Sequence, residues 1–288
     1  MEVCGVDIKR DFWIRPLWVA VVFLLQPLAV CWGGAWTQEE GHSYNRLAVN
    51  YFYSEKEYVD DSDRVVYEND GSFQDANLNY YLEYGVTDDL TAIASIYYKQ
   101  LRREDSTIDI KTYGIGDVDL ALKYKILDNI AGVFSGQVLV KVPEFYDEND
   151  TLPLGNGQYD VEFRLLYGRS VYPLFPGYFN LEAGYRWRAE DPADEFRFLV
   201  EVGSDFGANF YGRAKLDGLL GLNNGDNTMD QYGNPTIAND FDLVKLDLTL
   251  GYQLSEQWGV EAEFTPTVYG ERTAYGQTYT LALVLKTF

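Results

Sequence analysis

The sequence predicts an all-β protein, a single antiparallel transmembrane β-barrel of the outer-membrane type with about twelve strands. Three observations lead to this prediction: apolar and polar residues alternate along most of the chain after residue 35, long and short connections alternate, and aromatic residues are abundant. The 24 tyrosines, 16 phenylalanines and 6 tryptophans accompany a mean hydropathy of only −0.25. A barrel with an aromatic, apolar outer face and a polar inner face gives such an average.

Residues 1–35 are expected to be a cleavable signal peptide, and residues 36–288 the barrel. Three basic residues precede the apolar run 17–30, which is too short and too Pro-interrupted for a comfortable membrane span. Gly33 and Ala35 supply the small residues that a signal peptidase requires. The segment therefore predicts export, and the barrel fold predicts the cell outer membrane as the location.

Both cysteines of the chain, Cys4 and Cys31, lie inside the expected signal peptide. A lipoprotein processing site at Cys31 is the alternative, although a bulky Val30 fits it poorly. Without Cys31 the mature chain has no disulfide, no cysteine metal site and no thiol nucleophile. The formal net charge of −22 argues against a nucleic-acid partner, because such binding depends on neutralising phosphates.

Alternation with a period of two is clearest at residues 178–188, and it returns at 117–125 and 76–84. Successive side chains of a strand point to opposite faces, so each of these segments predicts a strand with one apolar and one polar face. In the clearest segment the apolar face consists of Phe179, Leu181, Ala183, Tyr185 and Trp187.

The same test, with Gly, Pro, Asn and Asp clusters as breaks, predicts twelve strands near residues 43–54, 73–84, 90–101, 114–126, 132–142, 157–170, 178–189, 195–205, 209–221, 241–253, 258–268 and 276–288. An even number brings both ends of the barrel to one side. The odd-numbered connections are mostly the longer ones, as expected for external loops opposite periplasmic turns. Pro266 lies inside an expected strand and predicts a bulge or a strand end.

Residues suited to catalysis are scarce. The single histidine, His42, precedes the first strand, so a His-dependent hydrolase lacks its base and a zinc site lacks its ligands. The glycine turn at 114–117 has no following helix to hold a phosphate, and residues 223–227 lack the glutamate spacing of a calcium loop. We therefore expect no enzyme activity, no metal and no cofactor.

The polar strand faces point into the lumen of a closed barrel and provide the candidate site. A lumen plugged by its own ion pairs and a narrow polar conduit that selects solutes are both compatible with twelve strands. Arg186, Arg188, Arg197 and Glu201 are expected to narrow the lumen from two adjacent strands. The lumen-lining candidates are Asp117, Asp119, Lys123, Lys125, Glu162, Arg164, Glu182, Arg186, Arg188, Arg197, Glu201, Arg213, Glu261 and Glu263, with Lys215 and Asp217 on the same faces.

Several segments resemble the outer-membrane proteins grouped with the meta-pathway of phenol degradation, and among them the XagA-type proteins. This resemblance implies an outer-membrane barrel that passes small molecules, aromatic or hydrophobic ones included. The matching segments are Ala35-Trp36-Thr37-Gln38, Glu40-Gly41-His42, GIGDVDLALKY (114–124), VKVPEFYDENDTLPLGNGQYDVEFRLLYGRS (140–170), LEAGYRWRAEDPADEF (181–196) and TPTVYGERTAYGQTYTLAL (265–283).

The chain ends on Phe288, as the outer-membrane assembly signal does. It departs from that signal in parity, because Leu281, Leu283 and Leu285 fall on the opposite face and Lys286 replaces an apolar residue. Which face of the last strand meets lipid therefore stays open at this point.

Two functions follow as hypotheses. The first is a passive channel or transporter for small molecules. The second is a structural or surface-interaction barrel, with a plugged lumen and acidic external loops at 55–72, 143–156 and 222–240. Either predicts membrane lipid, lipopolysaccharide and the outer-membrane assembly machinery as partners, and the first adds a small-molecule solute.

Overall fold

The computed structural model describes residues 33–59, 62–190, 192–207, 209–225 and 240–288. All but the last three residues of the expected signal peptide lie outside these ranges, as does much of the acidic loop 222–240. Among the residues that are described, no helix has the length and apolar character needed to cross a membrane.

The described residues form thirteen strands and one 3-10 turn, Glu68–Asp70. The strands are β1 (Ser43–Tyr58), β2 (Arg64–Val66), β3 (Ser72–Thr87), β4 (Leu90–Glu104), β5 (Asp109–Asn129), β6 (Gly132–Val142), β7 (Asp160–Ser170), β8 (Gly177–Arg188), β9 (Glu195–Asp205), β10 (Phe210–Gly221), β11 (Asp242–Gln253), β12 (Trp258–Glu271) and β13 (Thr273–Thr287).

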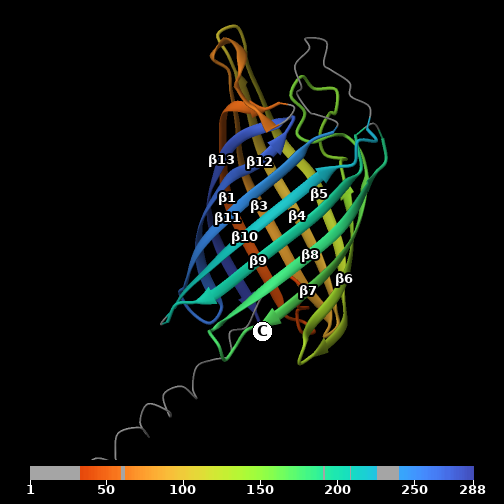
Figure 1. Ribbon diagram of the computed structural model, residues 1–288, viewed down its shortest axis with the longest axis vertical. Helices are drawn as coiled ribbons and strands as arrows, with labels where there is room; N and C mark the ends of the chain where they lie inside the picture. The colour runs from red at the N-terminus through yellow and green to blue at the C-terminus, as the bar shows by residue number, and fades with distance from the viewer. Residues whose placement is uncertain (1–32, 60–61, 191, 208, 226–239) are drawn as a thin grey trace, which may run out of the picture. The chain divides into compact units, whose positions relative to one another are not determined.

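Twelve of these strands close into one antiparallel barrel (Figure 1). Each strand pairs with its neighbour in sequence, and β13 returns to pair with β1 from Ser43 opposite Thr287 to Tyr58 opposite Thr273. The short β2 pairs only with the end of β1. The predicted fold class and the predicted number of strands are therefore confirmed.

The two faces of the strands explain why the sheet closes. In β5, Leu120, Leu122 and Tyr124 are each about half exposed on the outer face, at 49%, 55% and 54%, whereas Lys123 between them is buried. An apolar outer surface can face lipid. Closure pairs the backbone N–H and C=O groups of the first and last strands, which an open sheet would expose to lipid.

The last strand resolves the question of parity that the sequence left open. Leu281 and Leu283 are exposed on the outer face, and Ala282 and Val284 are buried on the inner face. Lys286 is on the same face of β13 as Ala282 and Val284, so its charge is not on the apolar outer wall.

The connections separate the barrel into two rims. At the turn rim, at the bottom of Figure 1, lie both ends of the barrel and the strand ends that are joined by residues 88–89, 130–131, 171–176, 206–209 and 254–257. At the loop rim, at the top, lie the strand ends that are joined by residues 59–71, 105–108, 143–159, 189–194, 222–241 and Arg272. The three longest connections all join strand ends of the loop rim, which agrees with the predicted segregation.

The strands β1, β4 and β5 extend further toward the loop rim than predicted, and charged pairs accompany the extension of β4 and β5. In the β4–β5 hairpin, Arg102 Nε lies 2.8 Å from Asp109 Oδ1, and Lys111 also pairs with Asp109. Pro266 lies within β12 as expected, and the register with β11 shifts beside it, where Val244 pairs with Tyr269 but Lys245 pairs with Thr267. That shift is the predicted bulge.

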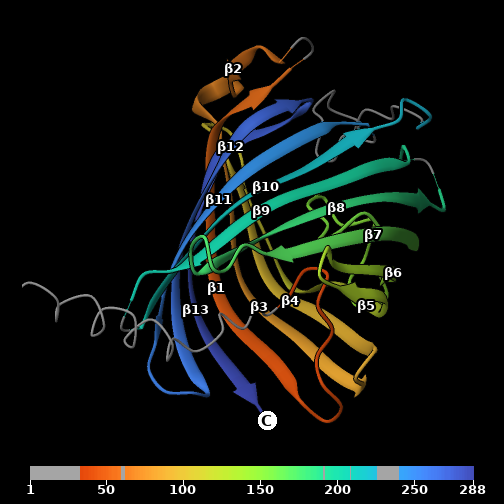
Figure 2. The same cartoon turned by 60° about the horizontal axis from the view of Figure 1, so that its bottom comes forward.

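The interior contains two segments that do not belong to the sheet. Residues 33–42, which we call the turn-rim segment, turn inward before β1 begins, and the connection 143–159, the inward loop, bends in from the loop rim (Figure 2). Each is accompanied by a small cluster of buried apolar residues. The clusters are Ala35, Val133 and Leu166 at the turn rim, and Leu101, Leu152 and Leu154 at the inward loop.

Candidate functional site

The charged residues of the inner faces form two networks and several separate pairs. Alternation in each strand points them inward, and antiparallel register brings residues of neighbouring strands into contact. We call the larger set the β7–β9 network and the smaller the β12 network. The β7–β9 network consists of Lys141, Asp160, Glu162, Arg164, Glu182, Arg186, Arg188, Glu195 and Arg197, and the β12 network of Arg46, Arg213, Glu261 and Glu263.

Glu162 is the centre of the β7–β9 network. Its side chain is fully buried, and its two oxygens lie 2.6 Å from Arg164 Nη2 and 2.8 Å from Arg186 Nη2. Arg164 continues to Glu182, with Nη1 2.6 Å from Oε2. Because both guanidinium groups converge on one carboxylate that water cannot reach, removing Glu162 would leave two buried positive charges.

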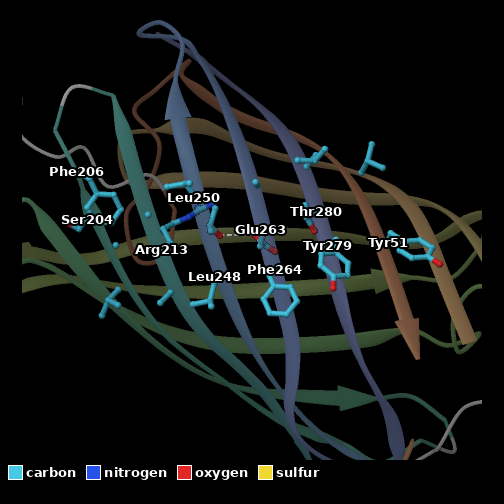
Figure 3. A pocket seen from close by; sticks show the side chains of 18 of the residues that line it. Tyr51, Ser204, Phe206, Arg213, Leu248, Leu250, Glu263, Phe264, Tyr279 and Thr280 are labelled. Atoms are coloured by element: carbon cyan, nitrogen blue, oxygen red, sulfur yellow. Dashed lines mark hydrogen bonds between the residues drawn. The ribbon is translucent and has the colours of Figure 1, made fainter. Parts of the chain in front are cut away.

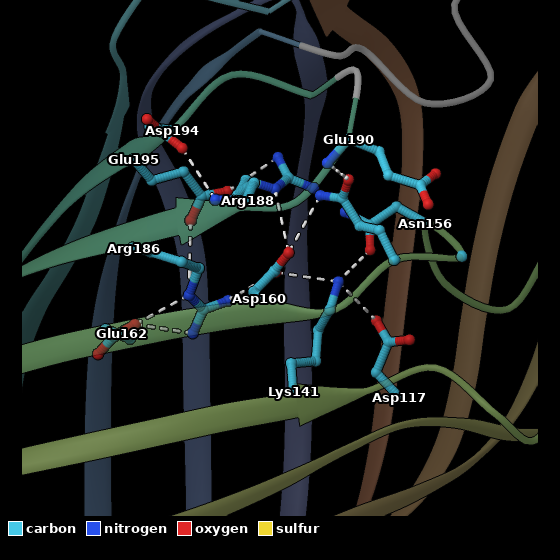
Figure 4. A network of polar contacts seen from close by, with 12 residues as sticks. Asp117, Lys141, Asn156, Asp160, Glu162, Arg186, Arg188, Glu190, Asp194 and Glu195 are labelled. Atoms are coloured by element: carbon cyan, nitrogen blue, oxygen red, sulfur yellow. Dashed lines mark hydrogen bonds and ion pairs between the residues drawn. The ribbon is translucent and has the colours of Figure 1, made fainter.

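The network continues toward the loop rim through the ends of β7, β8 and β9 (Figure 4). Arg188 lies between Asp160 and Glu195, with Nη1 3.2 Å from Glu195 Oε1. Arg197 Nη1 lies 3.1 Å from the other oxygen of Glu195. Acidic and basic groups alternate along this line, so each charge has an opposite neighbour.

Lys141 joins the network to the inward loop. Its Nζ lies 3.0 Å from Asp160 Oδ2 and 3.5 Å from Asp117 Oδ2, and it also donates to Asn156 of the loop. Tyr146 of the loop donates its hydroxyl to Asp117 at 2.6 Å. The inward loop is thus bound to the charged wall in the loop-rim half of the lumen.

The β12 network lies on β1, β10 and β12, nearer the turn rim. Arg46 Nε lies 2.9 Å from Glu261 Oε2, and Arg213 Nη2 lies 2.7 Å from Glu261 Oε1. The Tyr211 hydroxyl also donates to Glu261, at 2.9 Å, and Arg46 reaches Glu263 as well. Glu261 therefore has the same role here that Glu162 has in the larger network.

A further pair lies beside the turn-rim segment. Lys123 Nζ lies 3.3 Å from Glu83 Oε2 and donates to the Gly34 carbonyl at 2.9 Å. Glu83 also accepts a hydrogen bond from Gln38 Nε2 at 2.9 Å. Lys123, Glu83 and Gln38 are all nearly inaccessible to solvent.

The structure places the predicted residues as follows. Six of them meet in the β7–β9 network, and three meet in the β12 network. Lys125 lies at the turn rim, 3.2 Å from Asp89, and Asp119 has a buried Oδ1 with no hydrogen-bond partner among the described side chains. Lys215 pairs with Asp247 at 2.6 Å. The contacts of these residues were not foreseen, because they depend on register.

Glu201 is a correction. It was expected to narrow the lumen together with Arg186, Arg188 and Arg197, but the register pairs Glu201 with Asn180, several residues closer to the turn rim. Its Oε1 accepts hydrogen bonds from the Tyr178 hydroxyl and from Asn180. Glu195, which the sequence reasoning missed, takes the place expected for Glu201.

Three other contributors were also missed: Arg46, Lys141 and Asp160. Each has the inner parity of its strand, and Asp160 is spaced two residues from Glu162. Alternation alone could have found these residues. Their partners follow from register, which fixes Asp160 opposite Lys141 on one side and opposite Arg188 on the other.

The loop between β8 and β9 also closes on the network. Asp194 accepts hydrogen bonds from the Tyr185 hydroxyl at 2.6 Å and from the Arg188 amide at 2.8 Å. Asn224 Nδ2 donates to it from the next long loop, at 2.9 Å. Burial raises the pKa of the Asp194 carboxyl, but these hydrogen bonds outweigh burial and the pKa is lowered overall.

The outer wall has a feature of a different kind, an apolar trough with a volume of about 1020 Å³ across β9–β13 and β1 (Figure 3). Leu248, Phe264 and Tyr279 are among its lining residues, and neighbouring strands bring them into one row. These side chains belong to the exposed apolar face. The trough is therefore mainly part of the outer wall, although Arg213 and Glu263 of the β12 network also line it.

Among the described residues, no group of three His, Cys, Asp or Glu side chains is arranged to hold a metal ion. His42 lies at the turn rim, where its ring contacts Phe288 at a centroid distance of 6.0 Å and Glu39 is 3.6 Å away.

Closed antiparallel barrels with an apolar wall and a charged interior are the class of fold that outer-membrane channels use. An outer membrane channel from Pseudomonas putida has this fold, with a TM-score of 0.70 and 15% identity over 90% of this chain and 100% of its own. The translocator domain of the autotransporter NalP from Neisseria meningitidis has a TM-score of 0.50 and 10% identity over 87% and 90% of the two chains. No protein-family model and no curated protein sequence matches the chain.

Proposed function

We propose that this chain is an outer-membrane channel through which small molecules pass without an energy source. The observation that carries the proposal is a closed barrel whose inner wall holds charged networks at both ends. The solved structure that this fold matches over 100% of that structure's chain is described as an outer membrane channel. That description supports the proposal but belongs to the other protein.

The chemistry of the interior favours passage over simple packing. Buried ion pairs contribute little net stability, and well-packed apolar residues of similar volume are often as stable or more stable. A barrel that served only as a scaffold could fill its centre with apolar side chains, as small barrels do. Here Glu162, Lys123 and Glu261 occupy that space instead, as expected if the interior must interact with polar groups or water.

The solutes are small. The inward loop and the turn-rim segment both occupy the lumen, and the guanidinium groups of the β7–β9 network narrow it further. The sequence resemblance to phenol-degradation proteins makes aromatic compounds the first solutes to test. The apolar trough lies on the wall that would contact acyl chains, so a hydrophobic solute also has an apolar surface outside the lumen.

The channel is tested by reconstituting the purified chain into planar bilayers and into liposomes for solute flux. We expect small conductance steps, and we expect Arg188→Ala to change their size or ion selectivity, because Arg188 is buried between Asp160 and Glu195. Arg169→Ala is the matched control, since Arg169 is exposed at the turn-rim end of β7. No conductance and no flux in any preparation would reject the channel.

Export and location belong to the same proposal. A signal peptide at residues 1–35 would direct the chain to the outer membrane, with the assembly machinery inserting it and lipopolysaccharide surrounding the loop rim. We infer no catalytic role. Fractionation of cells places the protein, and a screen on lipid and peptide substrates with His42→Ala as comparison tests for activity.

A structural or surface-interaction barrel is the second candidate, and the two inward segments favour it. The inward loop and the turn-rim segment bind inner-wall lysines near the two ends of the lumen, Lys99 and Lys123. In that case, deleting the acidic residues around 62–70 would abolish a surface phenotype and leave solute permeability unchanged.

A further inference from the structure

The turn-rim segment reaches across the lumen without joining the sheet. The β1–β3 ladder ends where the Gly41 amide donates to the Gly85 carbonyl and the Gly85 amide to the His42 carbonyl. Before that point Thr37 donates to the Asp88 carbonyl, and the Gln38 amide donates to Thr91 Oγ1 at 2.8 Å.

The far end of the segment lies against the opposite wall. The Trp36 ring contacts Tyr178 of β8 edge to face, at a centroid distance of 5.9 Å, and packs against the cluster that contains Val133 of β6 and Leu166 of β7. Residues 36–38 therefore connect β3 and β4 with β6, β7 and β8 just inside the turn rim (Figure 2).

Two glycines of the wall form the seat for this segment. A Cβ at Gly168 would come within 2.4 Å of the Trp36 ring, and a Cβ at Gly85 would come within 1.9 Å of the Glu39 carbonyl oxygen. Any side chain at either position would push the segment out of place. The wall is shaped to receive it.

The attachments are suited to release. Gln38 binds the Glu83–Lys123 pair through a single side-chain hydrogen bond, which its neutral amide donates to the Glu83 carboxylate. If Gln38 leaves, Glu83 and Lys123 still have each other as partners. Gly41 has φ +79° with open space around a Cβ, so its left-handed backbone suits a chain reversal at the edge of the ladder.

We propose that residues 36–41 are a latch that closes the turn-rim mouth and swings outward about Gly41 to admit solute. This inference rests on the channel function proposed above and adds its regulation. Trp36 anchors the closed state in the seat at Gly168, and Gln38 fastens the middle of the latch to Glu83 and Thr91.

A disulfide tether tests the gate. In Gln38→Cys with Thr91→Cys, oxidation should hold the latch closed and abolish solute flux into liposomes, and reduction should restore flux to the wild-type level. Gln38→Cys alone, treated with the same oxidant, is the control. Equal, non-zero flux from the oxidised and reduced double variant would overturn the latch while leaving the channel proposal intact.

A second readout does not depend on flux. Gln38 is 1% exposed, so a cysteine there should react with a membrane-impermeant maleimide only when the latch is out. Adding Trp36→Ala should raise the labelling rate at least tenfold, and adding Trp258→Ala, an outward tryptophan at the same rim, should not. Equal rates in all three proteins would reject the latch, even if wild-type protein showed no flux and the channel itself were rejected.

Discussion

Single carboxylates organise the interior of this barrel. Glu162 of β7 binds Arg164 of its own strand and Arg186 of β8, and Glu261 of β12 binds Arg46 of β1 and Arg213 of β10. Alternation in the sequence placed both glutamates on the inner face. It could not place Asp160 opposite Arg188 or separate Glu201 from the arginines, because those contacts depend on how far each strand slides past the next.

The dependence on one carboxylate gives the first prediction. Glu162→Ala should lower the free energy of unfolding by about 3–5 kcal/mol, because Arg164 and Arg186 would remain buried without their shared partner. Urea unfolding in detergent measures the loss. Glu256→Ala, in an exposed turn, should change stability by less than about 0.5 kcal/mol. Equal losses in the two variants would contradict the central role of Glu162.

Asp194 gives a prediction about pH. Its pKa is lowered from the ordinary value of 3.8, so its charged form stabilises the folded loop at pH values above the unfolded pKa. That contribution is lost as the pH falls through the lower, folded pKa. We expect the stability difference between wild type and Asp194→Asn to be constant above about pH 5 and to shrink below pH 3.8. A difference that grew on acidification would have the wrong sign.

At the scale of elements, strands were predictable and inward segments were not. Residues 132–142 and 195–205 were predicted with the bounds that the structure has, since alternation ends at clear turn residues. The inward loop has no regular alternation of apolar and polar residues. Its Leu152 and Leu154 are isolated apolar residues in an acidic connection, and only contacts with Leu101, distant in sequence, explain them.

The inward loop gives the third prediction. Leu154→Ser should release the loop from the lumen, because Leu154 is 3% exposed and losing its burial costs about 2–5 kcal/mol. Faster proteolysis within 143–159 and larger conductance steps are the expected results. Leu174→Ser, at a leucine that is 90% exposed in a turn, is the matched control. Unchanged proteolysis of Leu154→Ser would show that other contacts hold the loop.

At the scale of the whole molecule, closure connects all these features. Because the first strand pairs with the last, the charged faces surround a common interior, and the inward segments can contact strands from opposite sides. The sequence predicted closure from one argument, that two-sided strands without a membrane helix need a sheet free of edges. It could not show which residues meet at the seam.

The seam provides the last prediction. Val49 lies opposite Leu281 in the β1–β13 ladder, and directly paired residues have Cα separations of about 4.5–5.5 Å, within the range that a disulfide requires. Val49→Cys with Leu281→Cys should therefore oxidise within one chain and keep the barrel folded in SDS at a higher temperature. Val49→Cys with Leu283→Cys shifts one partner by two residues, to a separation of about 7–8 Å, and should not cross-link within the chain. Cross-linked dimers in place of the internal bond would mean that β1 and β13 pair between molecules, and the inner faces would then not enclose a single lumen.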